Sequence, residues 1–520
     1  MGSMNFYKIV FVIAVIINVF FSIKGWDEPP LDAHHFRQSQ TAITSYYTIK
    51  EGFRTDYITP VFGAPWSLPM EFPLYQWIVS VIVIIFKSPL VQSGRFVSLL
   101  FFYFSLLPIY SILNQITKNK QHSLIFLSIL LLSPTYIYWS RTFMIESTAF
   151  FLSIVFLWGY ISTLSKKHSI VNKFSIIALI AAILASMVKI TTLAVYVYAA
   201  MIFTVWYWLK EDRERRFSGK VIFKYSLHAL FYVIIIAVFS VSWIKYCDSV
   251  KLQNPMAFDF LTSYSLNEWY METFISKFSL ENWNQIFYYT LMIPKFLGSI
   301  NTELIRIPYI IVFIIFVTIV ISHLIFNKQR RFEILFCISA FFTAPLAFTK
   351  LHFIHVYYNY PNMIFLYFAV GFFLLSFIES SNDKIHKAGK FILLPLIFVI
   401  IFFSYMYEYY PLQKMNLNYP AVVEIVKNST MSEDVILIYG QDWDPTLPLG
   451  MERKTLMDRW NLPLNSEKIQ NSLRITGKNT IKGMLLSGNY DTLFIKERID
   501  YFGFKAIPIY SDNQFKFYIK

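Results

Sequence analysis

Runs of about twenty apolar residues recur along most of this 520-residue chain, and short polar turns separate them. Val221–Tyr246 and Ile305–Phe326 are two examples. A helix needs a run of that length to cross the hydrocarbon core of a bilayer, which is about 30 Å thick. Charged residues make up only 15% of the chain, whereas soluble domains contain about 25%. The sequence therefore predicts a mainly α-helical, polytopic membrane protein.

About 11 membrane spans are predicted, together with outer juxtamembrane helices. The spans are 5–24, 96–116, 122–139, 145–164, 173–188, 190–209, 221–246, 306–326, 332–349, 357–378 and 390–408. We expect the first span to be retained, because no small-residue cleavage pattern follows it. The stretch Phe72–Phe86 is also apolar, but it is short for a span.

Lysine and arginine concentrate in five turns between the spans. These turns are 118–120, 166–173, 210–220, 328–331 and 384–390. All five fall on the cytoplasmic side, as the positive-inside rule requires, if the N-terminus is cytoplasmic and Phe72–Phe86 does not cross. We therefore expect Phe72–Phe86 to be an interfacial or re-entrant helix on the outer face. The net charge of +14 follows from this rule and does not indicate nucleic-acid binding.

The chain divides into a membrane core, 1–408, and an external tail, 409–520. Residues 25–95 and 247–305 are the larger outer loops of the core. The tail carries 14 Lys and Arg against 12 Asp and Glu, and it alternates strand-like with helix-like runs, which predicts a small α/β domain. The predicted strands are Val435–Tyr439, Thr492–Lys496, Lys505–Tyr510 and Phe515–Ile519, and the predicted helices are Ala421–Asn428 and Ser466–Ile475.

On this topology, the polar side chains that are costly to place within a membrane gather at the outer ends of the spans. They are Asp32, His34, His35, Arg37, Gln38, Glu71, Arg141, Glu146, Lys189, His355, Tyr357 and Tyr358. Charged groups at membrane depth usually face a cavity or a partner. A carboxylate in such a cavity takes a proton from an incoming hydroxyl, and fixed cations stabilise a phosphate. The set suits chemistry on the phosphate headgroup of a lipid.

Each of these residues also has a structural interpretation. Asp32 would cap a juxtamembrane helix, and with His34 and His35 it would form a metal site, although Asp-x-His is a weak signal. Arg141 with Glu146 would be an interfacial anchor or a structural ion pair.

The remaining alternatives concern groups at the membrane surface and in the core. Lys189 would extend to the lipid headgroups, and the tyrosines 357 and 358 would belong to an aromatic belt. Cys247 and Cys337 are expected to pack in the core without a disulfide or zinc.

Four stretches resemble the GT-C superfamily of membrane glycosyltransferases. They are Leu31-Asp-Ala-His-His-Phe-Arg-Gln-Ser-Gln-Thr-Ala42, Met70-Glu-Phe-Pro-Leu-Tyr75, Ser140-Arg-Thr-Phe-Met-Ile-Glu146 and His355-Val-Tyr-Tyr-Asn-Tyr-Pro361. The resemblance is to family 39-like enzymes, which include protein O-mannosyltransferases, the lipid A aminoarabinose transferase and rhizobial galacturonosyltransferases. It covers roughly residues 1–380.

The resemblance implies a polyprenyl-phosphate-linked sugar donor and a catalytic base in the first outer loop, which is Asp32 here. Residues that would bind the donor phosphate are Arg141, Lys189, His355, Tyr357 and Tyr358. Residues that would shape the substrate cavity are His34, His35, Arg37, Gln38, Glu71 and Glu146. Ser39-Gln40 stands where an acidic residue is expected, so no metal or other cofactor is implied.

The expected activity is transfer of one sugar, with inversion, to a hydroxyl of a glycan, lipid or protein acceptor. The protein would lie in a bacterial inner membrane, with the site and the tail on the periplasmic side. We expect the tail to recognise the acceptor or cover the site. The alternative is a transporter or flippase of lipid-linked sugars, although the inverted repeats and interrupted helices common in transporters are not evident in the sequence.

The topology predicts that positions 119 and 470 lie on opposite sides of the membrane. Cysteines introduced singly at these positions, in a background without Cys247 and Cys337, should react with a membrane-impermeant reagent from opposite sides. Labelling of both from the same side would contradict the predicted topology.

Overall fold

The computed structural model describes residues 2–165, 172–210, 217–267, 273–291, 318 and 329–520. The chain forms two compact units. Unit 1 comprises Met1–Trp26, Ser98–Ser240 and Asn267–Met415, and unit 2 comprises Asp27–Val97, Val241–Leu266 and Asn416–Lys520. Apart from residue 318, the predicted span 306–326 lies outside the described residues, as do parts of the basic turns 166–173, 210–220 and 328–331.

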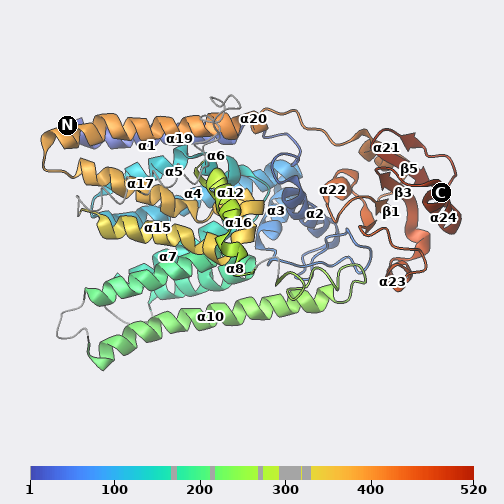
Figure 1. Cartoon of the computed structure of the whole chain (residues 1–520), viewed down its shortest axis with the longest axis horizontal. Helices are drawn as coiled ribbons and strands as arrows, with labels where there is room; N and C mark the ends of the chain where they lie inside the picture. Colours follow the sequence, from blue (N-terminus) through green and yellow to red (C-terminus); the bar gives the residue numbers. More distant parts are fainter. Residues whose placement is uncertain (1, 166–171, 211–216, 268–272, 292–317, 319–328) are drawn as a thin grey trace. The chain divides into compact units, whose positions relative to one another are not determined.

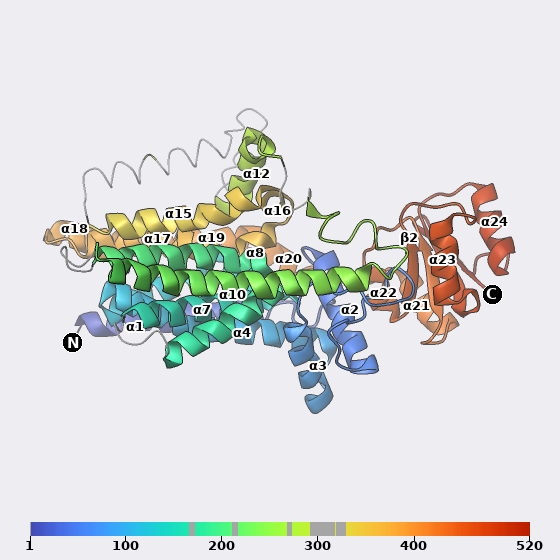
Figure 2. The ribbon, with the colours of Figure 1, turned by 90° about the horizontal axis from the view of Figure 1, so that it is seen from below.

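Unit 1 consists of helices, the longest of which run side by side (Figure 1 and Figure 2). They are α1 (Gly2–Ser22), α4 (Leu90–Thr117), α5 (Lys120–Leu132), α6 (Pro134–Tyr138), α7 (Glu146–Ser165), α8 (Lys173–Leu209), α10 (Gly219–Lys251), α12 (Leu280–Leu291), α15 (Arg331–Ala347), α16 (Thr349–Ile354), α17 (Met363–Ile378), α18 (Asp383–Ala388), α19 (Leu394–Glu408) and α20 (Tyr410–Gln413). Helices α4 and α10 also contribute residues to unit 2.

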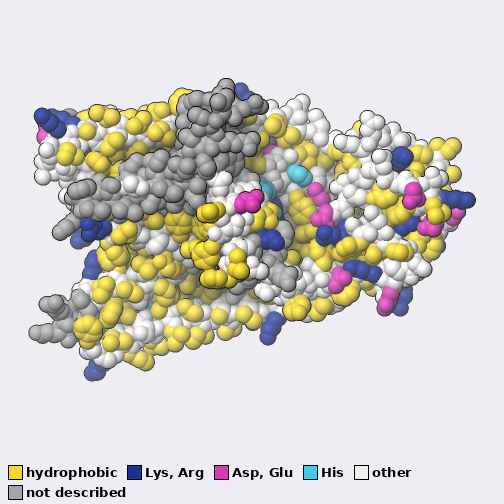
Figure 3. Space-filling model, in the orientation of Figure 1, with side chains coloured by type: hydrophobic (Ala, Val, Ile, Leu, Met, Phe, Trp, Pro, Cys, Tyr) yellow, Lys and Arg dark blue, Asp and Glu magenta, His cyan; other side chains and the backbone are white. Residues whose placement is uncertain are grey.

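Five described helices are long and apolar enough to cross a bilayer, or six when the bent pair Lys120–Leu132 and Pro134–Arg141 counts as one span. Hydrophobic side chains cover much of the surface of these helices (Figure 3). Large apolar side chains such as Ile16 on α1, Phe223 on α10 and Phe403 on α19 are more than 60% exposed, which suits contact with lipid. The chain is an integral membrane protein.

Helix α8 reverses direction at Lys189, whose backbone is extended (φ −163°, ψ 91°) rather than helical. A Cβ on Gly159 of α7 would lie 2.7 Å from the carbonyl oxygen of Phe174, while the next residue, Tyr160, is hydrogen-bonded to Thr204. A straight helix would separate Phe174 from Thr204 by about 45 Å. The two halves of α8 therefore fold back along α7, and they correspond to the two predicted spans 173–188 and 190–209.

Two predicted spans differ from the observed helices, and proline is the reason in both. The span 122–139 bends by 66° between α5 and α6, because Pro134 begins a new helix and lacks an N–H for the preceding turn. The predicted span 357–378 becomes helical only at Met363, after the 3₁₀ turn Val356–Asn359 (η3). Pro361 has no backbone N–H to donate to the carbonyl of Tyr357, so a regular helix cannot run through this turn unbroken.

Three of the five basic turns meet at one end of unit 1. Arg330, before α15, donates to Glu379 at 2.7 and 2.9 Å, and His122 near the start of α5 lies 3.1 Å from the same carboxylate. The turns around 118–120, 328–331 and 384–390 thus share one end of the helices, as the charge pattern predicted.

Unit 2 is built around a mixed five-stranded sheet in the order β2-β1-β3-β5-β4. The strands are β1 (Val435–Tyr439), β2 (Lys454–Asp458), β3 (Ile481–Ser487), β4 (Tyr510–Ser511) and β5 (Phe515–Ile519). Strand β1 pairs in parallel with β2 and β3, whereas β5 is antiparallel to β3 and β4. The helices of the unit are α2 (His35–Glu51), α3 (Leu74–Phe86), α21 (Ala421–Ser429), α22 (Thr446–Met451), α23 (Glu467–Thr476) and α24 (Thr492–Phe502).

The first outer loop pairs directly with the edge of this sheet. The carbonyl oxygens of Pro60 and Val61 accept from the backbone N–H groups of Thr455 and Met457 on β2, at 2.9 and 2.8 Å. Phe62 and Met256, from the two outer loops, are fully buried in the core of the sheet. This pairing covers an edge strand that would otherwise be open. The sequence analysis had assigned these loops to the membrane core.

The tail is confirmed as an α/β structure, with corrections to its elements. Residues 492–496 were predicted as a strand, but they begin helix α24, because the side chain of Asp491 accepts from the N–H of Phe494 and caps the helix. Of 505–510, only Tyr510 is in a strand. Strands β2 and β3 were not predicted.

Helix α3 is apolar along most of its length, and it is buried on one side near its start and exposed at its end. Tyr75 and Val79 are buried, whereas Ile85 and Phe86 are 64% and 72% exposed.

In the turn after β1, we predict that position 440 tolerates only glycine. Gly440 has φ +76°, and a Cβ there would lie 1.9 Å from the carbonyl oxygen of Ser487. Gly503 has a similar φ of +77° but open space around it. Gly503→Ala should therefore cost about 1–2 kcal/mol, and Gly440→Ala clearly more, as measured by the thermal unfolding midpoint. Equal effects would show that the close contact is not important.

Candidate functional site

The predicted site residues form two clusters, one in each unit. The α2 cluster, in unit 2, contains Asp32, His34, His35, Arg37, Gln38 and Glu71. The α7 cluster, in unit 1, contains Arg141, Glu146, Lys189, His355, Tyr357 and Tyr358.

Asp32 lies just before helix α2 and is 9% exposed. Its Oδ1 accepts a hydrogen bond from the Nε2 of Gln38, which is fully buried and also donates to the carbonyl of Ala33 at 3.0 Å. The N-cap position of α2 belongs to His34 and not to Asp32. The helix-cap alternative for Asp32 is therefore not supported, and the amide of Gln38 fixes the orientation of the carboxylate.

Arg37 and Glu71 form the charged pair of the α2 cluster. Arg37 Nη2 donates to Glu71 Oε2 at 3.1 Å, and Nη1 donates to Gln40 Oε1 at 2.5 Å. The N–H groups of Met70 and Glu71 both donate to the hydroxyl of Tyr57. Gln40 and Tyr57 were not predicted as site residues. Glu71 is thus held by a cation and by backbone contacts, which suits a role in shaping the cavity.

The two adjacent histidines have opposite electrostatic environments. Burial, with a smaller contribution from the charge of His35, lowers the pKa of His34 to about 4. The pKa of His35 is raised, chiefly because its Nε2 lies 3.4 Å from the carboxylate of Asp444 and further because Asp32 is close. The environment therefore favours the neutral form of His34 and stabilises the charged form of His35.

A buried ion pair defines the α7 cluster. Lys189 Nζ lies 2.5 Å from Glu146 Oε2, and both side chains are less than 10% exposed. The ammonium group also lies 4.0 Å from the ring centroid of Tyr358 and 5.2 Å from that of Tyr357. Lys189 is therefore buried in a cage of two rings and a carboxylate instead of extending to the lipid headgroups. This arrangement fixes a cation in a low-dielectric environment.

Arg141 and His355 are the remaining predicted site residues in unit 1. Arg141 is buried, donates from Nη2 to the carbonyl of Gly25 at 3.0 Å and lies over the ring of Tyr138. Glu146 pairs with Lys189 rather than with Arg141, so the predicted alternative of an Arg141–Glu146 ion pair is wrong. The ring of His355 lies 5.4 Å from that of Tyr357 and 6.0 Å from that of Tyr358.

Asp444 was missed by the sequence analysis. It belongs to Gly440-Gln-Asp-Trp-Asp444, immediately after β1. Polar residues that follow a parallel strand often lie at a ligand-binding edge of the sheet. That signal was available, but it required β1 to be recognised as a parallel strand.

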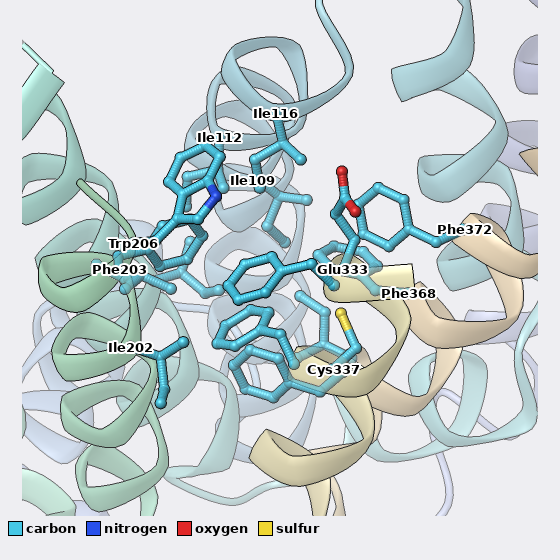
Figure 4. A pocket seen from close by; sticks show the side chains of 16 residues that line it. Ile109, Ile112, Ile116, Ile202, Phe203, Trp206, Glu333, Cys337, Phe368 and Phe372 are labelled. Atoms are coloured by element: carbon cyan, nitrogen blue, oxygen red, sulfur yellow. The ribbon is translucent and has the colours of Figure 1, made fainter. Parts of the chain in front are cut away.

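One apolar pocket lies within unit 1, apart from all the predicted site residues (Figure 4). It is lined by α4, α7, α8, α15 and α17, and Glu333 is the charged residue among its lining side chains. Its volume is about 40 Å³, whereas sites for small ligands usually measure about 300–1,000 Å³. We therefore do not assign the chemistry to this pocket. Within the described part of the chain, no three His, Cys, Asp or Glu side chains are arranged to hold a metal ion.

The buried ion pair predicts an asymmetric effect on stability. Lys189→Met leaves the carboxylate of Glu146 uncompensated and should destabilise the protein by about 3–5 kcal/mol. The double variant with Glu146→Gln should recover most of that loss. Lys387→Met is a control, because Lys387 pairs with Asp383 where both side chains are more than 60% exposed, and it should change stability by less than about 1 kcal/mol. Thermal unfolding of the purified protein measures the effects, and no recovery in the double variant would contradict the pairing.

No family model and no curated protein matches the sequence. Solved structures do match the fold. ArnT from Cupriavidus metallidurans bound to undecaprenyl phosphate is similar with a TM-score of 0.60 and 12% identity, over 99% of this chain and 98% of that chain. The apo form of the same enzyme matches with a TM-score of 0.60, 13% identity and the same coverage. The chain therefore has the same fold as ArnT, a mainly α-helical fold, as the sequence predicted.

Proposed function

We propose that this protein is a membrane glycosyltransferase that takes its sugar from a polyprenyl phosphate. The acceptor is a hydroxyl group of a glycan, lipid or protein, reached on the outer face of the membrane. Support for the donor comes from the fold, since ArnT, which has the same fold, binds undecaprenyl phosphate. The observation that carries the proposal is Asp32, a buried carboxylate oriented by Gln38 at the start of α2.

Asp32 is the proposed general base. The acceptor oxygen attacks the anomeric carbon, the bond from that carbon to the phosphate oxygen breaks, and the hydroxyl proton passes to the carboxylate of Asp32. The attack comes from the face opposite the leaving group, so the configuration at the anomeric carbon inverts. Glu71 and Glu146 are assigned other roles, because each lies within ion-pair distance of a cation, Arg37 and Lys189 respectively.

The α7 cluster is proposed to bind the donor phosphate. As the sugar leaves, negative charge grows on the phosphate, and fixed cations stabilise it most at that stage. Lys189 is held in one place by Glu146 and the two tyrosine rings. Because its partners are already in position, little reorganisation is needed when charge develops. Arg141 and His355 supply further donors.

In this proposal Gln38, Arg37 and Glu71 support Asp32 and would shape the substrate cavity. Gln38 holds the carboxylate, and the Arg37–Glu71 pair joins the start of α2 to the segment before α3. Transport of lipid-linked sugars is the competing function. Release of free polyprenyl phosphate from a lipid-linked sugar by purified protein distinguishes the two, because a transporter leaves the donor intact.

The proposal predicts that Asp32→Asn separates turnover from binding. The substitution keeps the shape but removes the proton acceptor, so turnover should fall by about 100-fold or more while donor affinity is retained. Arg141→Ala and Lys189→Ala should instead weaken donor binding together with turnover. Donor affinity and turnover are measured separately for each variant.

The matched control is Asp27→Asn, an exposed aspartate in the same loop that accepts from Gln92. It should leave both quantities close to those of the unsubstituted protein. Near-normal turnover in Asp32→Asn would remove Asp32 as the base and leave Glu71 and Glu146 as candidates.

A further inference from the structure

The loop after strand β1 contacts helix α2 at three successive points. Asp444 Oδ2 lies 3.4 Å from His35 Nε2, the hydroxyl oxygens of Thr446 and Ser39 lie 3.3 Å apart, and the ring of Trp443 meets Phe36 edge-on at 4.7 Å. All these residues belong to unit 2. A carboxylate from the tail is therefore directly beside the residues that follow Asp32.

Asp444 is held firmly in this position. Its Oδ1 accepts from the backbone N–H of Thr446 at 2.9 Å and from the Thr446 hydroxyl at 2.6 Å. The neighbouring Trp443 packs on the rings of Phe62 and Phe260 from the two outer loops. Because one oxygen is occupied by Thr446, the other, Oδ2, is the one that faces His35. The carboxylate is oriented before any substrate binds.

The charged groups that face His35 come from three places. Asp444 lies on the loop after β1, Asp32 precedes α2, and His34 is adjacent in the chain. The two carboxylates favour the imidazolium form of His35. Burial alone would raise the pKa of Asp444, but the hydrogen bonds from His35 and Thr446 outweigh it, so that this pKa is lowered.

We propose that Asp444 is a positioning residue that keeps His35 in one orientation next to Asp32 and stabilises its imidazolium form. The α/β sheet thereby supplies part of the electrostatic environment of the base. The effect on turnover rests on the proposed function, whereas the contact between Asp444 and His35 does not. This assigns the tail a role in the chemistry that goes beyond covering the site or recognising an acceptor.

The pairing is tested by chemical labelling of the full-length protein without substrate. Diethyl pyrocarbonate reacts with neutral imidazole, so the pH dependence of labelling at His35, read by mass spectrometry of the fragments, reports its protonation. The carboxylate of Asp444 stabilises the charged ring, and Asp444→Asn should therefore move the labelling midpoint to lower pH. When the midpoint falls by one on the pH scale, the ratio of neutral to charged ring at a given pH rises about tenfold.

Two further variants control this experiment. Asp442→Asn, two residues away, removes a carboxylate that pairs with Arg459 at 3.1 Å and should leave the His35 midpoint unchanged. Asp444→Glu should restore it at least in part. An unchanged midpoint in Asp444→Asn, or an equal shift in Asp442→Asn, would overturn the proposal.

Turnover provides an independent measurement. The substrate is a polyprenyl-phosphate-linked sugar, and turnover is measured as a function of pH. In Asp444→Asn the alkaline limb of this profile, where activity falls as pH rises, should move to lower pH. Most of the activity on the acidic side of the profile should be retained. A loss that is the same at every pH would indicate a merely structural role and would also overturn the proposal. If the unsubstituted protein shows no transfer at all, the proposed function fails, and the labelling result still decides the role of Asp444.

Discussion

The buried ion pair between Glu146 and Lys189 ties together the elements on which unit 1 depends. Glu146 is the first residue of α7, and Lys189 is the point at which α8 reverses. A reversal this tight exposes backbone groups, and a lysine inside it requires a partner because an isolated charge is costly away from water. The pair satisfies the lysine and fixes both halves of α8 against α7. Tyr357 and Tyr358 then pack on the same ammonium group, so the turn before α17 is positioned by the same charge.

Unit 2 depends on a different kind of contact, backbone pairing between segments almost 400 residues apart. Residues 60–63 lie along the edge of β2 and contribute Phe62 to the core of the sheet. Asn254, from the second outer loop, donates to the carbonyls of Gly63 and Pro65 at 3.2 and 2.9 Å. The loops and the tail are therefore one folded structure. Because α2 and residues 60–63 belong to the same outer loop, the sheet also determines where Asp32 lies relative to the strand ends.

The α2 cluster illustrates how environment divides roles among similar side chains. His34 and His35 are adjacent, yet burial keeps the first neutral while a carboxylate favours the charged form of the second. The carboxylates differ in the same way. Glu71 is paired with Arg37, whereas Asp32 is oriented by the amide of Gln38. Such differences between neighbouring groups are a common basis for assigning acid, base and binding roles in active sites.

The sequence by itself determined that the chain is a polytopic helical membrane protein, which residues gather at the helix ends, and that the tail is an α/β structure. These follow from the length of apolar runs, the distribution of charge and the local alternation of residues, all of which act over short stretches. Only the tertiary structure decided that Glu146 pairs with Lys189, that the outer loops complete the sheet, and that Asp444 faces His35. Each of these joins residues distant in the chain, and local periodicity carries no information about such partners. The helix at 492–502 was misjudged because its cap, Asp491, outweighs the strand preference of the residues that follow.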